Sequence, residues 1–135
     1  ATDYCFATKN ASVKLSELAI GIGPFVVGPS IERKIGLSAF SQLTINATNW
    51  QSAQWAKEKG LFTEVYDTIE EMDRAILHLA EKLALSNPDS MRGLKEIMWS
   101  GTDHWDELLM ERAEISGKRV LSDFTRHTIK KLKKG

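Results

Sequence analysis

The stretch of sequence that decides the fold is residues 3–24, DYCFATKNASVKLSELAIGIGP. Its first part, Asp3–Thr8, is rich in aromatic and apolar side chains and predicts a strand, which ends at a turn-prone Lys-Asn pair. Val13–Leu15 alternates briefly between apolar and polar positions, and two glycines interrupt the apolar run that follows. The stretch therefore predicts short strands joined by glycine-containing turns. Glu17 is expected at a strand-to-loop edge, beside an apolar pocket.

The next forty residues continue this mixed pattern. Pro24 predicts the start of a helix that runs through Ile35 and stops at Gly36. Two more helices are predicted over residues 38–47 and 52–59, and a strand over residues 61–66. Three strands are too few for a self-sufficient sheet, and their edges would need partners from outside this chain.

From residue 67 onward the pattern is helical. Thr68, followed three residues later by Glu71, forms a predicted capping box. Behind it, apolar residues recur at three- and four-residue steps, at Ile69, Met72, Ile76, Leu79 and Leu83. Three later helices are predicted: the first restarts at Asn87-Pro88, and the other two are capped by Thr102 and Ser122. The third of the four helices is expected to be interrupted near Gly117.

Composition bears on several classes of function. Eighteen basic residues balance eighteen acidic ones, so no overall field would attract nucleic acid or an anionic membrane. The sequence has no signal peptide and no apolar stretch approaching the roughly 20 residues of a membrane helix. We therefore expect a cytoplasmic protein without nucleic-acid or membrane partners. The three histidines, His78, His104 and His127, lack metal-ligand spacing, and we expect no metal site.

Residues 3–24 resemble a well-marked stretch of the crotonase family, the acyl-CoA hydratases and isomerases. In that family an aspartate-led strand precedes the pattern A-x-F-x-x-P-E-x-x-x-G-x-x-P. The corresponding residues here are Ala11, Val13, Glu17, Gly21 and Pro24. Residues 43–65, LTINATNWQSAQWAKEKGLFTEV, are similar to the family's L-T-G-x-x-x-x-A-x-x-A-x-x-x-G-L-V-x-x-V stretch.

The resemblance implies an α/β fold in two parts. Residues 1–66 would form the C-terminal half of a crotonase-like ββα spiral core, and residues 67–135 an all-helical C-terminal oligomerisation domain. The sequence departs from the family at Ser16, where proline is commonest, and its Leu-Ser-Glu form is similar to some methylglutaconyl-CoA hydratase relatives. Residues 25–28 replace the usual glycine cluster, and Asn46 and Ala47 replace the usual glycine region of the second stretch.

The resemblance also implies the chemistry. An acyl-CoA thioester would be the substrate, with coenzyme A as part of it and no separate cofactor. Two backbone N–H groups would hold the thioester carbonyl, and Glu17 would deliver or remove a proton as the catalytic acid/base. Gly21, Pro24 and Phe25 would border the substrate. Lys130 and Lys131, in the basic tail, would contact coenzyme A phosphates, although a solvated helix end explains the same charges.

The family's oxyanion-hole donors and a second catalytic glutamate lie upstream of the position of Ala1. We therefore predict that these 135 residues belong to a larger chain and are inactive alone. The resemblance implies a homo-oligomer, a trimer or hexamer. It leaves open whether the reaction is hydration or isomerisation, and which acyl group is bound. It also leaves a catalytically incomplete CoA-binding or assembly module, or a crotonase-type CoA or C–C hydrolase, since fold does not settle function.

Overall fold

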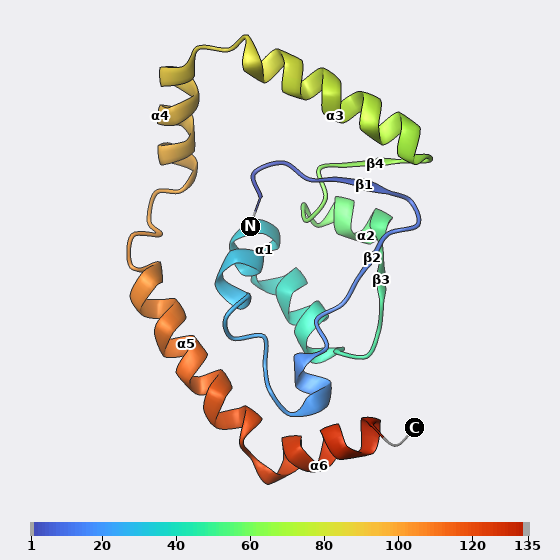
Figure 1. Cartoon of the computed structure of the whole chain (residues 1–135), viewed down its shortest axis with the longest axis vertical. Helices are drawn as coiled ribbons and strands as arrows, with labels where there is room; N and C mark the ends of the chain where they lie inside the picture. Colours follow the sequence, from blue (N-terminus) through green and yellow to red (C-terminus); the bar gives the residue numbers. More distant parts are fainter. Residues whose placement is uncertain (1, 134–135) are drawn as a thin grey trace.

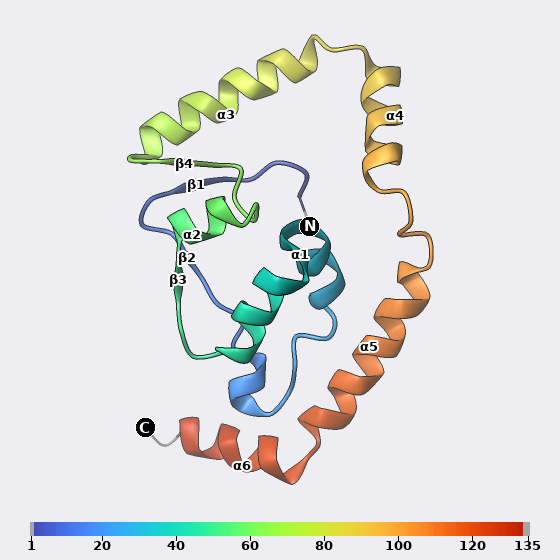
Figure 2. The ribbon, with the colours of Figure 1, turned by 180° about the vertical axis from the view of Figure 1, so that it is seen from behind.

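The computed structural model of the chain describes residues 2–133. A mixed α/β region lies inside a curved series of helices, which Figures 1 and 2 show from opposite sides. The elements of the α/β region are β1 (Phe6–Thr8), β2 (Ser12–Val13), the 3₁₀ helix η1 (Glu17–Ile20), α1 (Gly28–Ile45), β3 (Gln51–Ser52), α2 (Ala53–Glu58) and β4 (Glu64–Tyr66). The surrounding helices are α3 (Ile69–Ala84), α4 (Pro88–Met98), α5 (Trp105–Val120) and α6 (Asp123–Leu132). This arrangement confirms the predicted fold class.

The strands form two separate pairs. β1 lies parallel to β4, with Phe6 opposite Glu64 and Thr8 opposite Tyr66. β2 lies antiparallel to β3, with Val13 opposite Gln51. Both predicted long strands are shorter than expected, and within the described part of the chain each pair has two outer edges without a neighbouring strand. The described strands therefore form two separate two-stranded pairs, and the expectation of partner strands from outside this chain stays a prediction.

Helix α1 joins two segments that the sequence predicted as separate helices. It begins at Gly28, later than the predicted start at Pro24, and the intervening residues 25–27 form a turn. Gly36, where the first helix was expected to stop, has φ 76° and ψ 160°, so the helical backbone is interrupted there as predicted and α1 consists of two helical segments that meet at this kink. A residue with a side chain rarely adopts positive φ, so glycine permits this change of direction.

Local capping signals placed most of the outer helices correctly. The capping box of α3 is present, with Glu71 N–H donating to Thr68 Oγ1 and Thr68 N–H to Glu71 Oε2, both at 3.2 Å. Asn87 caps α4, and Ser122 caps α6 by accepting from Thr125 N–H. These helices begin where a side-chain oxygen satisfies their first free N–H groups.

The predicted cap at Thr102 is wrong. Its hydroxyl donates to the Trp99 carbonyl at 2.7 Å and is therefore engaged with the end of the preceding helix. Helix α5 begins three residues later, and its N-cap residue, His104, makes no side-chain capping bond. The interruption expected near Gly117 is also absent, because α5 runs continuously to Val120.

The end of α4 is tied to the N-terminal segment and to α1. Asp3 accepts hydrogen bonds from Lys95 and, at 2.6 Å, from Trp99 Nε1. These donors, Lys95 first, lower the pKa of the Asp3 carboxyl. Arg33 of α1 donates to the Met98 carbonyl, and its guanidinium lies over the Trp99 ring. The junction between α4 and α5 is thereby fixed against the α/β region.

The buried apolar core is small and lies within the α/β region. Its members are mostly alanines, namely Ala7, Ala39, Leu43, Ala47, Ala53 and Ala56. The outer helices leave many large apolar side chains in solvent, among them Ile69, Leu77, Leu85, Leu94, Ile97, Met110, Leu121, Phe124 and Leu132. Exposed apolar surface on this scale is typical of a surface that another chain or segment covers. Within residues 2–133, no helix is both long and apolar enough to cross a bilayer.

Candidate active site

Glu17 begins the 3₁₀ helix η1, four residues after β2. The expected strand-to-loop edge is thus replaced by a short helical turn, closed by the Ile22 N–H, which donates to the Glu17 carbonyl at 3.0 Å. The side chain is half-buried, and its Oε2 atom is shielded from solvent without a hydrogen-bond partner among the described residues. A buried, unpaired carboxylate oxygen is destabilising, and a catalytic role is one physical reason for retaining such a group.

Gly21 ends η1 and packs against the first turn of helix α6. Its φ is 84°, in the left-handed region that favours glycine. A Cβ atom here would collide with the Phe124 ring and lie 2.8 Å from Thr125 Oγ1. Thr125 is fully buried, and its hydroxyl accepts from Ser122 Oγ at 3.1 Å. The C-terminal helix is therefore packed directly on the turn that carries Glu17.

Pro24 and Phe25 border a cavity of about 300 Å³. Its other walls come from α1 and α5, at Gly28, Pro29, Glu32, Phe40, Thr44 and Arg112. Phe25 folds back over Gly23, where a Cβ would lie 2.6 Å from the phenyl Cζ. Phe25 and Phe40 thus occupy space that the glycines at 23 and 28 leave free. Of these residues, the sequence had singled out only Pro24 and Phe25.

Lys130 and Lys131 lie in the last turn of α6, and both are exposed. The helix that carries them contacts η1, so the structure brings their element to the Glu17 segment. Of the predicted residues, Pro24 and Phe25 line the same cavity, and Gly21 contacts the first turn of α6. Lys130 and Lys131 do not line that cavity.

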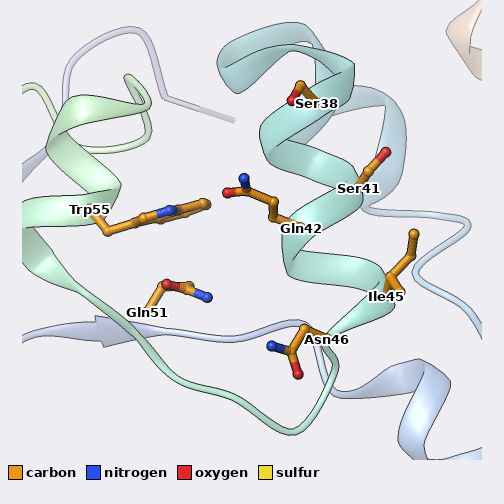
Figure 3. A pocket seen from close by; sticks show the side chains of 7 residues that line it. All are labelled: Ser38, Ser41, Gln42, Ile45, Asn46, Gln51 and Trp55. Atoms are coloured by element: carbon orange, nitrogen blue, oxygen red, sulfur yellow. The ribbon is translucent and has the colours of Figure 1, made fainter.

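The groove in Figure 3 lies elsewhere, between α1 and α2. It encloses about 440 Å³, and Gln42 extends from α1 toward the Trp55 ring of α2. Its lining residues are Ser38, Ser41, Gln42, Ile45, Asn46, Gln51 and Trp55, and none of them carries a charge. No predicted site residue lines it, and amides and hydroxyls alone are poor general acids or bases at neutral pH.

A cluster of titratable groups lies on the β1–β4 pair. Tyr4 and Tyr66 both donate hydrogen bonds to the Glu64 carboxylate, Tyr4 through one oxygen and Tyr66 through the other. These bonds, that of Tyr4 first, lower the pKa of Glu64, and the bond to Glu64 raises the pKa of Tyr66 to about 12. The cluster stabilises the ionised carboxylate and the neutral phenols. Across residues 2–133, no three histidine, cysteine or acidic side chains gather as metal ligands would.

Arg112 is a lining residue of the cavity beside Phe25 that sequence reasoning missed. It lies on α5, more than eighty residues beyond Phe25 in the chain, and no local motif marks it. Its Nε atom is buried without a hydrogen-bond partner among the described residues. Only the folding of α5 alongside α1 brings it to the cavity. An arginine at a mostly polar helix position gives no signal of its own in the sequence.

The profile of the family described as Enoyl-CoA hydratase/isomerase matches residues 1–133. The chain therefore belongs to the enoyl-CoA hydratase/isomerase family, the crotonases. A solved enoyl-CoA hydratase/isomerase from Pseudoalteromonas atlantica T6c superposes with a TM-score of 0.87 at 18% identity, covering 98% of this chain and 53% of that one. An enoyl-CoA hydratase from Bacillus halodurans gives a TM-score of 0.85 at 14% identity, covering 95% and 51%.

An enoyl-CoA hydratase from Mycobacterium avium superposes with a TM-score of 0.77 at 24% identity, covering 94% of this chain and 49% of that one. At these identities the superpositions establish the fold. The chain spans about half the length of the solved structures that it matches. No significant match was found among curated proteins. The division of the chain at residues 66 and 67 stays a prediction.

Proposed function

We propose that this chain is the acid/base part of an acyl-CoA hydratase or isomerase, in which Glu17 transfers a proton at the acyl group. The observation that carries the proposal is the shielded Oε2 atom of Glu17, which has no partner among the described residues. The Glu17 side chain is only half-buried, and a substrate that reaches its carboxylate would not first have to break a protein hydrogen bond to Oε2. Its position in the matched family stretch agrees with this role.

The rest of the reaction needs groups from outside this chain. Removing or adding a proton beside a thioester carbonyl develops negative charge on the carbonyl oxygen, and fixed N–H donors must stabilise it. We propose that the other half of a full-length protein supplies these donors, because this chain covers about half of its structural relatives. The chain alone would then be inactive. Coenzyme A enters as part of the substrate, and the reaction needs no further cofactor.

Lys130 and Lys131 are proposed to contact the phosphates of coenzyme A. They form an exposed basic end on the helix that packs against η1. Replacing both with Gln in the full-length protein should raise KM for a thioester at low salt and leave kcat unchanged, because phosphate contacts bind without reacting. Lys118→Gln on α5, an exposed lysine paired with Glu114 at 2.6 Å, is the matched control. An unchanged KM in the double variant would contradict the contact.

We also propose a homo-oligomer, a trimer or hexamer. The support is the large set of apolar side chains that α3 to α6 leave exposed. Covering them would remove apolar surface from water, which drives most subunit association. Sedimentation of the full-length protein tests this, and a monomer at micromolar concentration would contradict it.

The central test of the proposed function is Glu17→Gln in the full-length protein. The amide keeps the size of the side chain but neither gives nor takes the proton. We expect turnover of short 2-enoyl-CoA and 3-enoyl-CoA thioesters to fall about 10²- to 10⁴-fold, with thioester binding retained. Glu70→Gln, at an exposed position on α3, should have no effect. Full turnover in Glu17→Gln would contradict the role of Glu17 as the acid/base. Binding of thioesters without any turnover in wild type would favour a CoA-binding or assembly module, and thioester hydrolysis would favour a crotonase-type hydrolase.

A further inference from the structure

The cavity beside Phe25 has both apolar and charged walls. The rings of Phe25 and Phe40 and two prolines form its apolar side, and Thr44 adds a hydroxyl. Arg112 from α5 and Glu32 from α1 supply its charges. At about 300 Å³ it lies at the small end of ligand-binding pockets. It can therefore enclose the end of a short acyl group, and it is too small for the nucleotide part of coenzyme A.

Arg112 lacks a protein partner for its buried atom. Its Nε is out of contact with solvent and makes no hydrogen bond within residues 2–133. The four ion pairs found in this part of the chain do not include it. An arginine keeps its charge at every physiological pH, and a buried donor without an acceptor is destabilising. The position is thus suited to a ligand that brings an acceptor.

The geometry of a guanidinium selects the kind of acceptor. Its fixed N–H groups match the two oxygens of a carboxylate, which can accept two parallel hydrogen bonds. The phenyl and proline walls fit the methylene carbons that would precede such a carboxylate. A carboxylate in the cavity would give the Arg112 guanidinium, which lines the cavity and makes no ion pair among the described residues, an acceptor.

The negative charge of Glu32 would repel the carboxylate of a bound ligand, and the exposed position of Glu32 limits this repulsion. The side chain belongs to an exposed residue of α1, whereas Arg112 is half-buried with a shielded Nε. Like charges repel weakly where water separates them, so the repulsion is smaller than the attraction at the buried arginine. Removing the Glu32 charge should therefore strengthen the binding of an anionic acyl end.

We propose that Arg112 is a specificity-determining residue that selects acyl-CoA thioesters whose acyl group ends in a carboxylate. The inference rests on the proposed function, because the thioester end must reach Glu17 while the far end occupies the cavity. The segment that begins at Glu17 continues through Gly21 into Pro24 and Phe25, which line the cavity, so eight residues of chain or fewer separate the two. Arg112 acts on binding and takes no part in proton transfer.

Two thioesters of equal length test the proposal on the full-length protein. Glutaconyl-CoA ends in a carboxylate where 2-pentenoyl-CoA ends in a methyl group. We expect wild type to prefer glutaconyl-CoA in kcat/KM. Arg112→Met should raise KM for glutaconyl-CoA about 10- to 100-fold, the usual size of a lost hydrogen bond to a charged group. Turnover of 2-pentenoyl-CoA should stay within about threefold, which also shows that the variant is folded.

Further variants separate the possible outcomes. Arg112→Lys should restore part of the preference, Glu32→Gln should lower KM for glutaconyl-CoA, and Arg119→Met, at an exposed position on the same helix, should change neither substrate. Equal losses for both thioesters in Arg112→Met, or no preference in wild type, would overturn the inference and leave the proposed function standing. Turnover of neither thioester by wild type would overturn the proposed function itself.

Discussion

Gly21 shows how one residue connects the candidate active site to the C-terminal helix. It combines a left-handed backbone with direct contact to Phe124 and Thr125. A side chain at this position would be strained by its φ and would also displace α6. The turn that begins at Glu17 therefore depends on a glycine four residues later. This requirement gives a physical reason for glycine to follow the glutamate at this spacing in the stretch that resembles the family pattern.

Gly21→Ala should accordingly destabilise the protein by about 2 kcal/mol or more, from left-handed strain of about 1–2 kcal/mol plus the contact with α6. Gly117→Ala is the control, because it lies within α5 and a Cβ there meets nothing within 4 Å. That change should stabilise by about 0.5–1 kcal/mol. Urea unfolding measures both, and equal effects of the two substitutions would contradict this account of Gly21.

Glu64 and its two tyrosines predict a pH dependence at both extremes. The lowered pKa of Glu64 means that its contribution to stability is present above the ordinary carboxyl range and is lost as pH falls through the lowered value. The pKa of Tyr66, raised to about 12, means that its contribution is lost as pH rises toward that value. Ultraviolet titration of the phenols should show the Tyr66 shift disappear in Glu64→Gln, and an unshifted Tyr66 in wild type would contradict the hydrogen bond.

Single residues were predictable from the sequence where a pattern framed them. Glu17, Gly21 and Pro24 were singled out through their spacing, and the structure places Gly21 against α6 and Pro24 on a cavity, while their functional roles stay predictions. Arg112 was not predictable, because its meeting with Phe25 depends on how α5 packs alongside α1. Contacts between distant segments leave no trace in local spacing.

At the scale of elements, helix starts followed from the sequence when the capping group had no competing partner. Thr68 and Ser122 each accept from N–H groups of their own helix, as predicted, and Asn87 caps the helix that was predicted to restart at Asn87-Pro88. Thr102 failed because its hydroxyl turns back to the Trp99 carbonyl. The strands were predicted too long, since pairing with a partner strand, and not local propensity, sets how far a strand extends.

The capping box gives a test at this scale. Thr68→Ala removes the acceptor for the Glu71 N–H at the start of α3. We expect a loss of about 1 kcal/mol in the free energy of unfolding, the usual size for an N-cap. Thr68→Ser keeps the hydroxyl and should cost much less. Thermal unfolding of both variants measures the difference, and equal losses would show that the hydroxyl does not cap the helix.

At the scale of the whole molecule, the described residues bury little apolar surface among themselves. Its core is small and alanine-rich, its two strand pairs have open edges among the described residues, and its outer helices expose large apolar side chains. It also spans about half of the enoyl-CoA hydratase structures with which it superposes. Composition did not predict the small core or the exposed apolar side chains, because apolar content does not indicate which apolar residues pack together within the chain.

Proton exchange on a saturated thioester tests the central claim most directly. Butyryl-CoA has no double bond to hydrate or shift, so deuterium uptake from D₂O at its α carbon reports only proton transfer beside the thioester carbonyl. We predict that the full-length protein catalyses this uptake and that Glu17→Gln slows it about 10²- to 10⁴-fold while butyryl-CoA still binds. Uptake at the wild-type rate in Glu17→Gln would contradict the role of Glu17 as the acid/base.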